Sequence, residues 1–424
     1  MNNGTIYWLW LSLAVTPGSS TFSKLLSKCS DAEEIFALDK DDYVSLVGSK
    51  CKDITALCDK RLDKAEEIYN FCVSKNVGIL VYSDEKYPKL LKEISNPPVL
   101  LYYRGVLPDF NSSFCVSVVG TRRLSEYGKR NAFNISFDLA RAGATVVSGM
   151  AIGVDGVSHA GAIAAGMPTV AVMGSGIDVC YPKQHIHLAR EIVKNGCVFT
   201  EYPPGSPPDG ANFPIRNRII SGLSQATLII EGRERRSGAL WSARHAKEQG
   251  RAVYALPGNV GNINSELPNL LIKNGASVCM SADDIVRDFE KKSFGILDPF
   301  ELAKSASVNM NEVLEKLRIS SVAVDDKIFR HSGAGNKETA KRNEAEAVIP
   351  VVDETPDKSQ QITLEGFDTN AVKIYQRIPQ GEGCEIETLI DDELSLRVVM
   401  NALLKLEIGK FITMLPGERV RRNF

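Results

Sequence analysis

Between residues 114 and 280, hydrophobic residues gather in short runs rich in β-branched side chains, and segments of helical length separate these runs. Runs that are apolar throughout, instead of alternating with polar residues, are typical of parallel strands buried on both faces. The pattern therefore predicts an α/β protein with a doubly wound parallel sheet. The seven expected strands are Phe114–Val119, Thr145–Ser148, Thr169–Met173, Cys197–Thr200, Thr227–Ile230, Arg251–Leu256 and Ser277–Met280.

The sequence before these strands has a different pattern. Residues 1–75 carry apolar positions at helical spacing, among them Leu25 and Cys29, which predicts a small helical domain, SAM-like or HhH-like. Residues 76–113 contain two proline-bearing turns, so we expect an extended connector there. This connector opens the domain that holds the sheet, which is expected to span residues 76–290.

A linker and a last domain are expected after the sheet. Residues 291–364 are mixed in charge and poor in aromatic side chains, as flexible linkers are. Within residues 365–424, helical periodicity near 371–378, 385–390 and 399–406, followed by a hairpin pattern, predicts a winged-helix domain. Winged helices usually bind duplex DNA. Here acidic residues outnumber basic ones, so we expect this domain to contact protein.

Composition and charge narrow the possible partners. The chain has 424 residues, of which 44% are hydrophobic and 24% charged, and this excludes disorder along most of its length. Lysine plus arginine total 50 against 52 for aspartate plus glutamate, so any nucleic-acid surface must be local. Such a local excess lies between Gly210 and Arg251, where eight basic residues accompany three acidic ones.

Other residue types argue against several classes of function. The nine cysteines form no Cys-x-x-Cys pair, which favours reduced thiols in the cytoplasm. The apolar stretch Ile6–Val15 is too short to span a bilayer, so no membrane association is expected. The five histidines have no metal-ligand spacing, and we predict no metal, no cofactor and no catalytic residue. His159, four residues after Asp155, is the one pair compatible with acid–base chemistry, and a structural hydrogen bond is the alternative.

Three turns follow the first three predicted strands. The carboxyl ends of parallel strands meet at one edge of the sheet, where open α/β sheets bind ligands, and strand-to-helix turns there present backbone N–H groups to anions. The alternative is that Ser125 only caps a helix and that the glycines only serve turn geometry. The candidate residues in these turns are Gly120, Arg122, Ser125, Ser148, Gly149, Gly153, Gly174, Ser175 and Gly176.

The basic segment supplies further candidates. An aromatic ring beside closely spaced arginines is how proteins hold single strands, by stacking and phosphate pairing. One of the two arginines could instead serve a structural ion pair. The candidates here are Phe213, Arg216, Asn217 and Arg218, together with Ser237 and Gly238, which open the next helix.

Together these motifs resemble the DNA processing protein A family, also called DprA or Smf. The resemblance covers roughly residues 80 to 290. It implies a Rossmann-like domain that binds single-stranded DNA without cutting it, delivers it to the RecA recombinase in natural transformation and recombination, and forms a homodimer. The matching segments are Gly120–Gly128, Ser148–Asp155, Gly174–Gly176 with Tyr181-Pro182, Glu201–Gly205, Phe213–Gly222 and Ser237–Ala239.

The resemblance also assigns roles to residues. It places Arg122 and Ser125 on phosphate, uses the glycine turns to line the pocket, and has Arg216 and Arg218 grip the strand. Lys183 is a further candidate, in a loop that departs from the family pattern. The alternative function is a Rossmann-like hydrolase that cleaves the glycosidic bond of nucleoside monophosphates. Its Pro-Gly-Gly-x-Gly-Thr loop is absent from this sequence, but Glu201 and Glu231 remain as candidate carboxylates.

Overall fold

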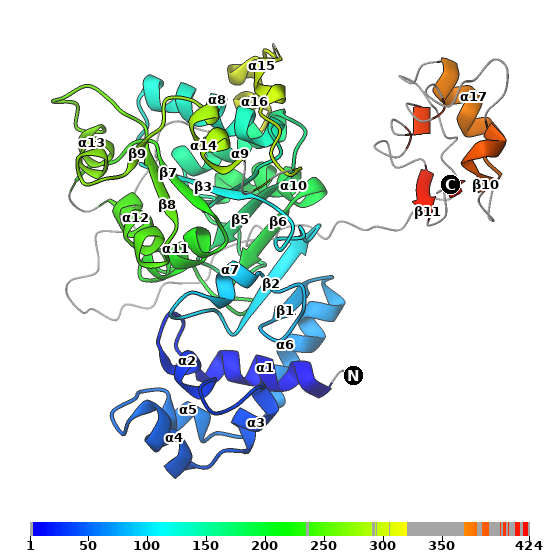
Figure 1. Cartoon of the computed structure of the whole chain (residues 1–424). Helices are drawn as coiled ribbons and strands as arrows, with labels where there is room; N and C mark the ends of the chain where they lie inside the picture. Colours follow the sequence, from blue (N-terminus) through cyan, green and yellow to red (C-terminus); the bar gives the residue numbers. More distant parts are fainter. Residues whose placement is uncertain are drawn as a thin grey trace. The chain divides into compact units, whose positions relative to one another are not determined.

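The computed structural model describes residues 3–234, 237–290, 293, 295–304, 306–319, 369–379, 384–389, 399, 402, 403, 406, 412–415 and 419–422. Contacts divide the chain into two compact units, Met1–Val352 and Asp353–Phe424 (Figure 1). No helix within the described ranges is long and apolar enough to cross a membrane.

The described part of the first unit is built on a nine-stranded sheet with the order β1-β2-β6-β5-β4-β3-β7-β8-β9. All neighbouring strands from β6 to β9 in this order are parallel, so the predicted doubly wound parallel sheet is confirmed. The strands are β1 (Gly78–Val81), β2 (Leu100–Gly105), β3 (Cys115–Val119), β4 (Thr145–Ser148), β5 (Thr169–Met173), β6 (Cys197–Thr200), β7 (Ala226–Ile229), β8 (Ala252–Ala255) and β9 (Ser277–Val278).

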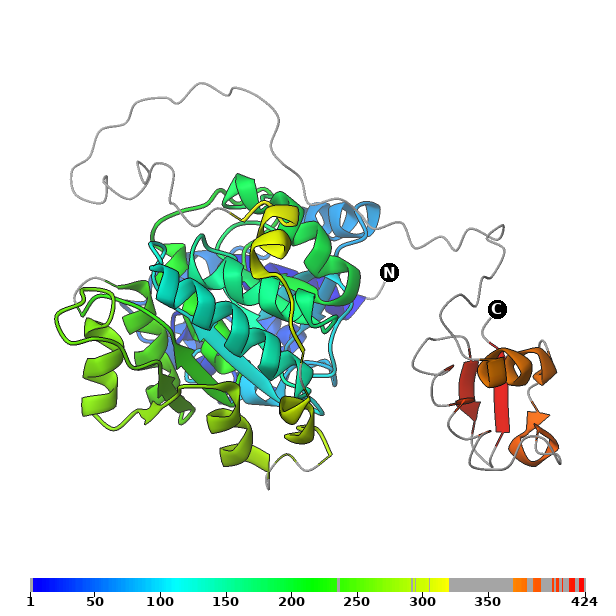
Figure 2. The same ribbon diagram turned by 90° about the horizontal axis from the view of Figure 1, so that it is seen from above.

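Helices cover both faces of the sheet, which explains why its strands are apolar throughout. Along β3, Val116 and Val118 belong to one hydrophobic cluster, whereas Cys115 and Val119 belong to the other. Figure 2 shows α8, α9 and α10, in teal to green, running alongside the sheet on one face. The helices on this face are α8 (Glu126–Arg141), α9 (Val154–Ala164), α10 (Ile186–Asn195) and α14 (Ala282–Glu290), and those on the other are α11 (Asn212–Gly222), α12 (Gly238–Glu248) and α13 (Glu266–Lys273).

The strand order reverses between β3 and β7. Strands β4, β5 and β6 continue the sheet on one side of β3, and β7, β8 and β9 continue it on the other. Such a reversal separates the two loops that leave the carboxyl ends of the central strands, and this opens a crevice. The fold therefore places any ligand site beyond Val119 and Ile229, the last residues of β3 and β7.

The expected connector, residues 76–113, is wrong in one respect, because it contains strands β1 and β2. These strands pair antiparallel with each other and with β6, and so extend the sheet. Tyr102 in β2 is fully buried, whereas Gly78 in β1 lies under the ring of Tyr103, where a side chain would overlap it. The surrounding prolines hid these short strands in the sequence.

The first part of the expected linker, residues 291–364, contains regular structure. Two short helices, α15 (Phe300–Ala303) and α16 (Met310–Lys316), lie within it. Leu314 and Leu317 are buried against the cluster that covers α8 and α9. The charged residues around these two leucines in the sequence concealed that they belong to the hydrophobic core. Residues 320–364 lie outside the described ranges.

Residues 3–74 are mostly helical and pack against the β1–β2 end of the sheet (Figure 1). Two hydrogen bonds join this segment to the turn before β2, from Asn96 Nδ2 to the Gly18 carbonyl at 2.7 Å and from Ser23 Oγ to the Ser95 carbonyl at 2.6 Å. The helices are α1 (Asn3–Ala14), α2 (Thr21–Leu25), α3 (Ala32–Ala37), α4 (Lys40–Val47), α5 (Ile54–Leu57) and α6 (Asp63–Ser74).

The described residues of the second unit include α17 (Thr369–Arg377) and a three-stranded sheet with the order β10-β12-β11. Strands β11 (Ile412–Leu415) and β12 (Arg419–Arg422) form an antiparallel pair. Where a helix is expected near 385–390, the structure has a short 3-10 helix at Ile386–Leu389, preceded by strand β10 (Cys384–Glu385). Much of the third expected helix lies outside the described residues, so the winged helix stays a prediction.

Candidate nucleic-acid interface

A cleft of about 610 Å³ opens at the point where the strand order reverses. Loops after β3 and β7 and the first turns of α9, α11 and α12 form its walls. Its size is that of ordinary ligand sites. The lining residues are Val119, Gly120, Thr121, Arg122, Arg123, Ala151, Asp155, Gly210, Phe213, Pro214, Arg216, Asn217, Arg233, Ser237, Gly238, Ala239, Trp241 and Ser242.

The cleft is strongly cationic. Arg122 and Arg123 come from the loop after β3, Arg233 comes from the loop after β7, and Arg216 lies on α11. Among the lining residues described, Asp155 is the single acid. Four arginines around one cleft attract anions, and phosphate groups are matched especially well by guanidinium geometry. Arg235 and Arg236, in the loop after β7, lie outside the described residues.

The loop that carries Arg122 is held by close backbone contacts. Thr121 donates its N–H to the Glu231 carbonyl at 2.8 Å and accepts a hydrogen bond from Val154 N at 3.2 Å. Gly153 has φ +92°, and a side chain there would overlap the carbonyl oxygen of Thr121. Gly153 therefore lies behind the loop and allows the close approach that positions Arg122.

Arg216 forms the floor of the cleft. It is 3% exposed, and its Nη1 donates to the carbonyl of Gly149 at 2.7 Å and to that of Val172. Burial lowers the pKa of Arg216 to about 10, an effect that Asp155 opposes. The guanidinium therefore remains charged at neutral pH. A side chain at Gly149 would overlap it, so this glycine also lies behind the cleft.

Asp155 lies beside this guanidinium at the start of α9. Its Oδ2 accepts a hydrogen bond from Ala151 N at 3.3 Å, and the side chain is buried. Burial raises the pKa of Asp155, whereas Arg216 and Arg122 act in the opposite direction. The carboxylate therefore offsets part of the positive charge below the cleft.

The ring of Phe213 is enclosed by cationic and aromatic groups. The guanidinium carbons of Arg122 and Arg216 lie 5.5 and 5.8 Å from the centre of its ring, and the ring of Tyr181 lies 5.5 Å away. An ideal side chain at Gly174 would come within 3.0 Å of the Phe213 ring, so Gly174 supports this ring from behind.

The N-terminus of α12 forms another part of the cleft wall. Ser237 caps this helix by accepting a hydrogen bond from Ala239 N at 3.3 Å. Gly238 is exposed, with open space where a side chain would stand, and its carbonyl accepts a hydrogen bond from Asn217 Nδ2. A helix N-terminus favours anions because its dipole and its first N–H groups point outward.

Five other predicted residues do not line the cleft. Ser125 caps α8 and donates its hydroxyl hydrogen to Glu231. Ser148 and Ser175 are buried and donate to the carbonyls of Val118 and Val179. The hydroxyls of Ser148 and Ser175 thus donate to the protein's own backbone, whereas that of Ser125 donates to a carboxylate. Gly176 is covered by the segment at Ser206, and Lys183 is exposed in the 3-10 turn Lys183–His185.

Arg218 also requires a correction. Its side chain is 2% exposed and forms an ion pair with Glu201, away from the cleft-lining residues. On α11, Arg216 and Arg218 are two positions apart, so they point to different sides of the helix. The alternative that one of the two arginines serves a structural ion pair describes Arg218.

The candidate acid–base groups are also engaged elsewhere. His159 is fully buried with Nδ1 at 2.8 Å from Thr169 Oγ1, and burial, followed by His185, lowers its pKa to about 3. Glu231 accepts hydrogen bonds from Ser125 and from Asn264 Nδ2. No group of three or more metal-binding side chains occurs among the described residues.

Sequence reasoning missed Trp241, Arg123 and Arg233 as lining residues. Arg123 directly follows the chosen Arg122, and Trp241 lies one helical turn after the chosen Gly238. The helical period was therefore the signal that could have found Trp241. The position of Arg233 depended on where the loop after β7 turns, which no sequence pattern specified.

A model of the family described as DNA recombination-mediator protein A matches residues 78–290, about half of the chain. The DNA processing protein DprA of Bacillus subtilis is 35% identical over 226 residues, which are 53% of this chain and 76% of that protein. The chain belongs to the DNA recombination-mediator protein A family. The resemblance inferred from the motifs is thereby confirmed.

Further proteins named DprA or Smf are similar to this chain. The protein Smf of Synechocystis is 40% identical over 215 residues, covering 50% of this chain and 54% of that protein. The X-ray structure of DprA from Streptococcus pneumoniae has a TM-score of 0.57 and 32% identity, covering 68% of this chain and 99% of that one. The family match includes every residue that lines the cleft.

Proposed function

We propose that this protein binds single-stranded DNA in the cleft, largely without sequence preference, and breaks no bond in it. The bound strand is then delivered to a RecA-class recombinase in natural transformation and recombination. The observation that carries this proposal is the concentration of four arginines around a cleft at the strand-order reversal. This excess of positive charge is local, because the whole chain has a net charge of −2.

The distribution of the arginines around the cleft favours a polynucleotide backbone over a single anion as the ligand. Arg123 and Arg233 are exposed and come from loops after β3 and β7, whereas Arg216 lines the same cleft from a buried position on α11. Exposed guanidinium groups on two loops can pair with successive phosphates, while a buried charge adds attraction from below. The helix N-terminus at Gly238 supplies a further anion position.

Single strands are favoured over duplexes because aromatic rings lie among the cations. The rings of Phe213 and Trp241 both line the cleft, together with four arginines. Alternating cationic and aromatic groups suit a strand whose bases are unpaired and can stack. Duplex bases are already stacked on their neighbours and do not offer their faces.

Binding without hydrolysis is proposed because the candidate carboxylates are committed to other contacts. The alternative glycosidase requires a carboxylate directed at the sugar. Glu201 is paired with Arg218, and Glu231 accepts hydrogen bonds from Ser125 and Asn264. Asp155 lines the cleft, but it lies against the guanidinium that forms the floor.

The recombination role rests on the family. Its description names a recombination mediator, and the Bacillus subtilis relative is named a DNA processing protein. We further propose that the protein acts as a homodimer in the cytoplasm. All nine cysteines, each among the described residues, are free thiols, and free thiols persist in reducing compartments.

Fluorescence anisotropy with labelled oligonucleotides tests the central proposal. We expect affinity to rise with oligonucleotide length, to exceed that for a duplex of equal length, and to fall as salt increases, because counterions are released. Chromatography of nucleoside monophosphates incubated with the protein tests the alternative. Equal affinity for both forms of DNA, or release of free base, would reject the proposed function.

A further inference from the structure

Trp241 is a large aromatic side chain exposed at the wall of the cleft. It is 45% exposed, whereas Trp8 and Trp10, the other tryptophans of the chain, are 4% and 3% exposed within the N-terminal helices. Burying an indole is strongly favourable, so an exposed one beside a cationic cleft calls for an explanation.

The packing of α12 shows why the indole is not part of the core. Ala239, Ala243 and Ala246 form the buried side of this helix. Trp241 lies off that side, and its ring neighbours are Arg244, whose guanidinium carbon is 5.4 Å from the ring centre, and His245, at 6.4 Å between ring centres. Both come from the next turn of the same helix, so the ring contacts of the indole within the described part of the chain come from α12 itself.

We propose that the indole of Trp241 is a stacking platform for one unpaired base of the bound strand. This inference rests on the proposed function and adds a subsite to it. Trp241 follows Gly238 by three residues, about 4.5 Å along the helix axis. A nucleotide whose phosphate meets the helix N-terminus therefore has its base within reach of the indole.

The ligand of this subsite is any nucleobase, because every base offers a π-face and stacking needs no particular hydrogen bonds. The cation of Arg244 near the ring adds attraction for the strand. Phe213 is a weaker candidate for this role, since two arginines, Tyr181 and the backbone at Gly174 already surround its ring.

Intrinsic fluorescence reports this contact directly. Stacking of a base on Trp241 quenches its emission, whereas Trp8 and Trp10 remain buried in the N-terminal helices. We expect quenching on titration with a thymidine oligonucleotide. An abasic oligonucleotide of equal length, which keeps the phosphates, should bind without quenching. The variant W241F should retain most of the affinity for the thymidine oligonucleotide, because a phenyl ring still stacks.

The variant W241A separates stacking from phosphate binding. We expect its affinity for the thymidine oligonucleotide to fall at least about fivefold, with little change for the abasic one. Val260→Ala is the matched control, since Val260 is 97% exposed and does not line the cleft. Circular dichroism verifies that each variant is folded.

The outcomes distinguish this inference from the function on which it rests. If neither oligonucleotide binds the unaltered protein, the proposed function and the subsite both fail. If both bind but W241A matches the unaltered protein, or emission does not change, the subsite is rejected while the proposed function stands. Quenching that is lost with the abasic oligonucleotide, together with the W241A defect, supports the subsite.

Discussion

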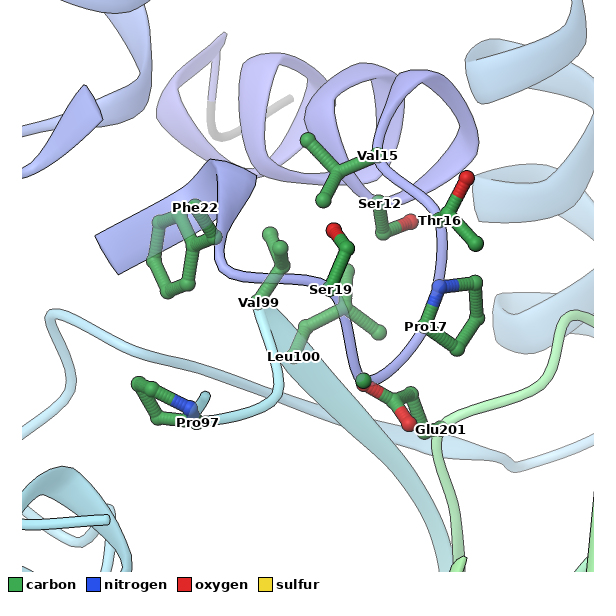
Figure 3. A pocket seen from close by; sticks show the side chains of 11 residues that line it. Ser12, Val15, Thr16, Pro17, Ser19, Phe22, Pro97, Val99, Leu100 and Glu201 are labelled. Atoms are coloured by element: carbon green, nitrogen blue, oxygen red, sulfur yellow. The ribbon is translucent and has the colours of Figure 1, made fainter. Parts of the chain in front are cut away.

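Arg218 and Glu201 form a buried ion pair, with Nη2 of the arginine 2.6 Å from Oε1 of the glutamate and 2% and 9% of their side chains exposed. The same guanidinium donates through Nε to the carbonyl of Asn96 at 3.0 Å, and Asn96 in turn donates to Gly18. Figure 3 shows Glu201 beside a small cavity formed by α1, the loop after it and the start of β2. Through Asn96, Arg218 therefore links α11 and the segment after β6 to the loop that follows α1.

Replacing Arg218 with alanine should lower the stability of the folded protein. It should not weaken DNA binding selectively. The change leaves the Glu201 carboxylate buried without its partner, which costs about 3 to 5 kcal/mol. Urea unfolding followed by circular dichroism measures this decrease in stability.

The double variant Arg218→Met with Glu201→Leu removes both charges and should recover much of the lost stability, because similar apolar volume replaces a buried pair at little cost. Normal stability of Arg218→Ala combined with strongly reduced DNA affinity would contradict this assignment and restore Arg218 to the binding site.

Arg233→Ala should weaken single-strand binding without affecting stability, because Arg233 is exposed at the cleft. Removing one charge-assisted hydrogen bond to a phosphate corresponds to about a tenfold decrease in affinity. The slope of log affinity against log salt should also become shallower by about 0.7, the share of one phosphate on a single strand. Anisotropy titrations at several salt concentrations measure both quantities.

Arg190→Ala is the matched control for this prediction. Arg190 is exposed on α10 and does not line the cleft, and its replacement changes the net charge by the same amount. If both variants showed the same decrease in affinity, the effect would come from overall charge, and Arg233 would have no specific role in binding.

The strands of the sheet could be predicted from the sequence because their composition is a local signal. The runs at Thr145–Ser148 and Thr169–Met173 are apolar on both faces and match β4 and β5 residue for residue. Strand β2 also carries an apolar run, but the prolines around it indicated a connector, and its antiparallel partners Gly78–Val81 and Cys197–Thr200 lie elsewhere in the sequence. Pairing across such a distance cannot be inferred from composition.

The residues of the candidate site could also be predicted only in part. The loops of Arg122 and Ser237 were predicted because turns after parallel strands must share one edge of the sheet. Arg216 and Arg218 looked alike in the sequence, since both follow Phe213 on one helix. Which of them faces the cleft depended on the rotation of α11 against its neighbours, and packing alone determines this.

Gly153→Ala should disturb the loop that carries Arg122. A side chain at φ +92° is strained, and its Cβ would also overlap the Thr121 carbonyl. Gly166 has φ +71° with open space around it, so Gly166→Ala carries the strain without the overlap. Backbone strain of this kind costs about 1 to 3 kcal/mol.

We therefore expect Gly153→Ala to lower the midpoint of thermal unfolding more than Gly166→Ala does, and to weaken DNA binding severalfold. Gly166→Ala should leave DNA binding unchanged. Equal effects of the two variants on DNA affinity would show that the position of the Arg122 loop does not depend on Gly153.

The buried imidazole of His159 predicts how stability depends on pH. Burial and His185 lower the pKa of His159 to about 3 in the folded protein, below the usual 6.5 that applies when the chain is unfolded. Between these two values the unfolded chain binds more protons than the folded one, so acid favours unfolding. The contribution of His159 to stability is therefore complete above pH 6.5 and is lost as the pH falls.

His159→Asn should remove this dependence while keeping a polar partner for Thr169, whose hydroxyl contacts Nδ1 of the imidazole. Lowering the pH from 7 to 5 should cost the unaltered protein about 2 kcal/mol through this one histidine, since one pKa unit corresponds to about 1.4 kcal/mol. Urea unfolding of both proteins at the two pH values gives the difference. If the variant lost as much stability as the unaltered protein between pH 7 and 5, another group would have to carry the acid sensitivity.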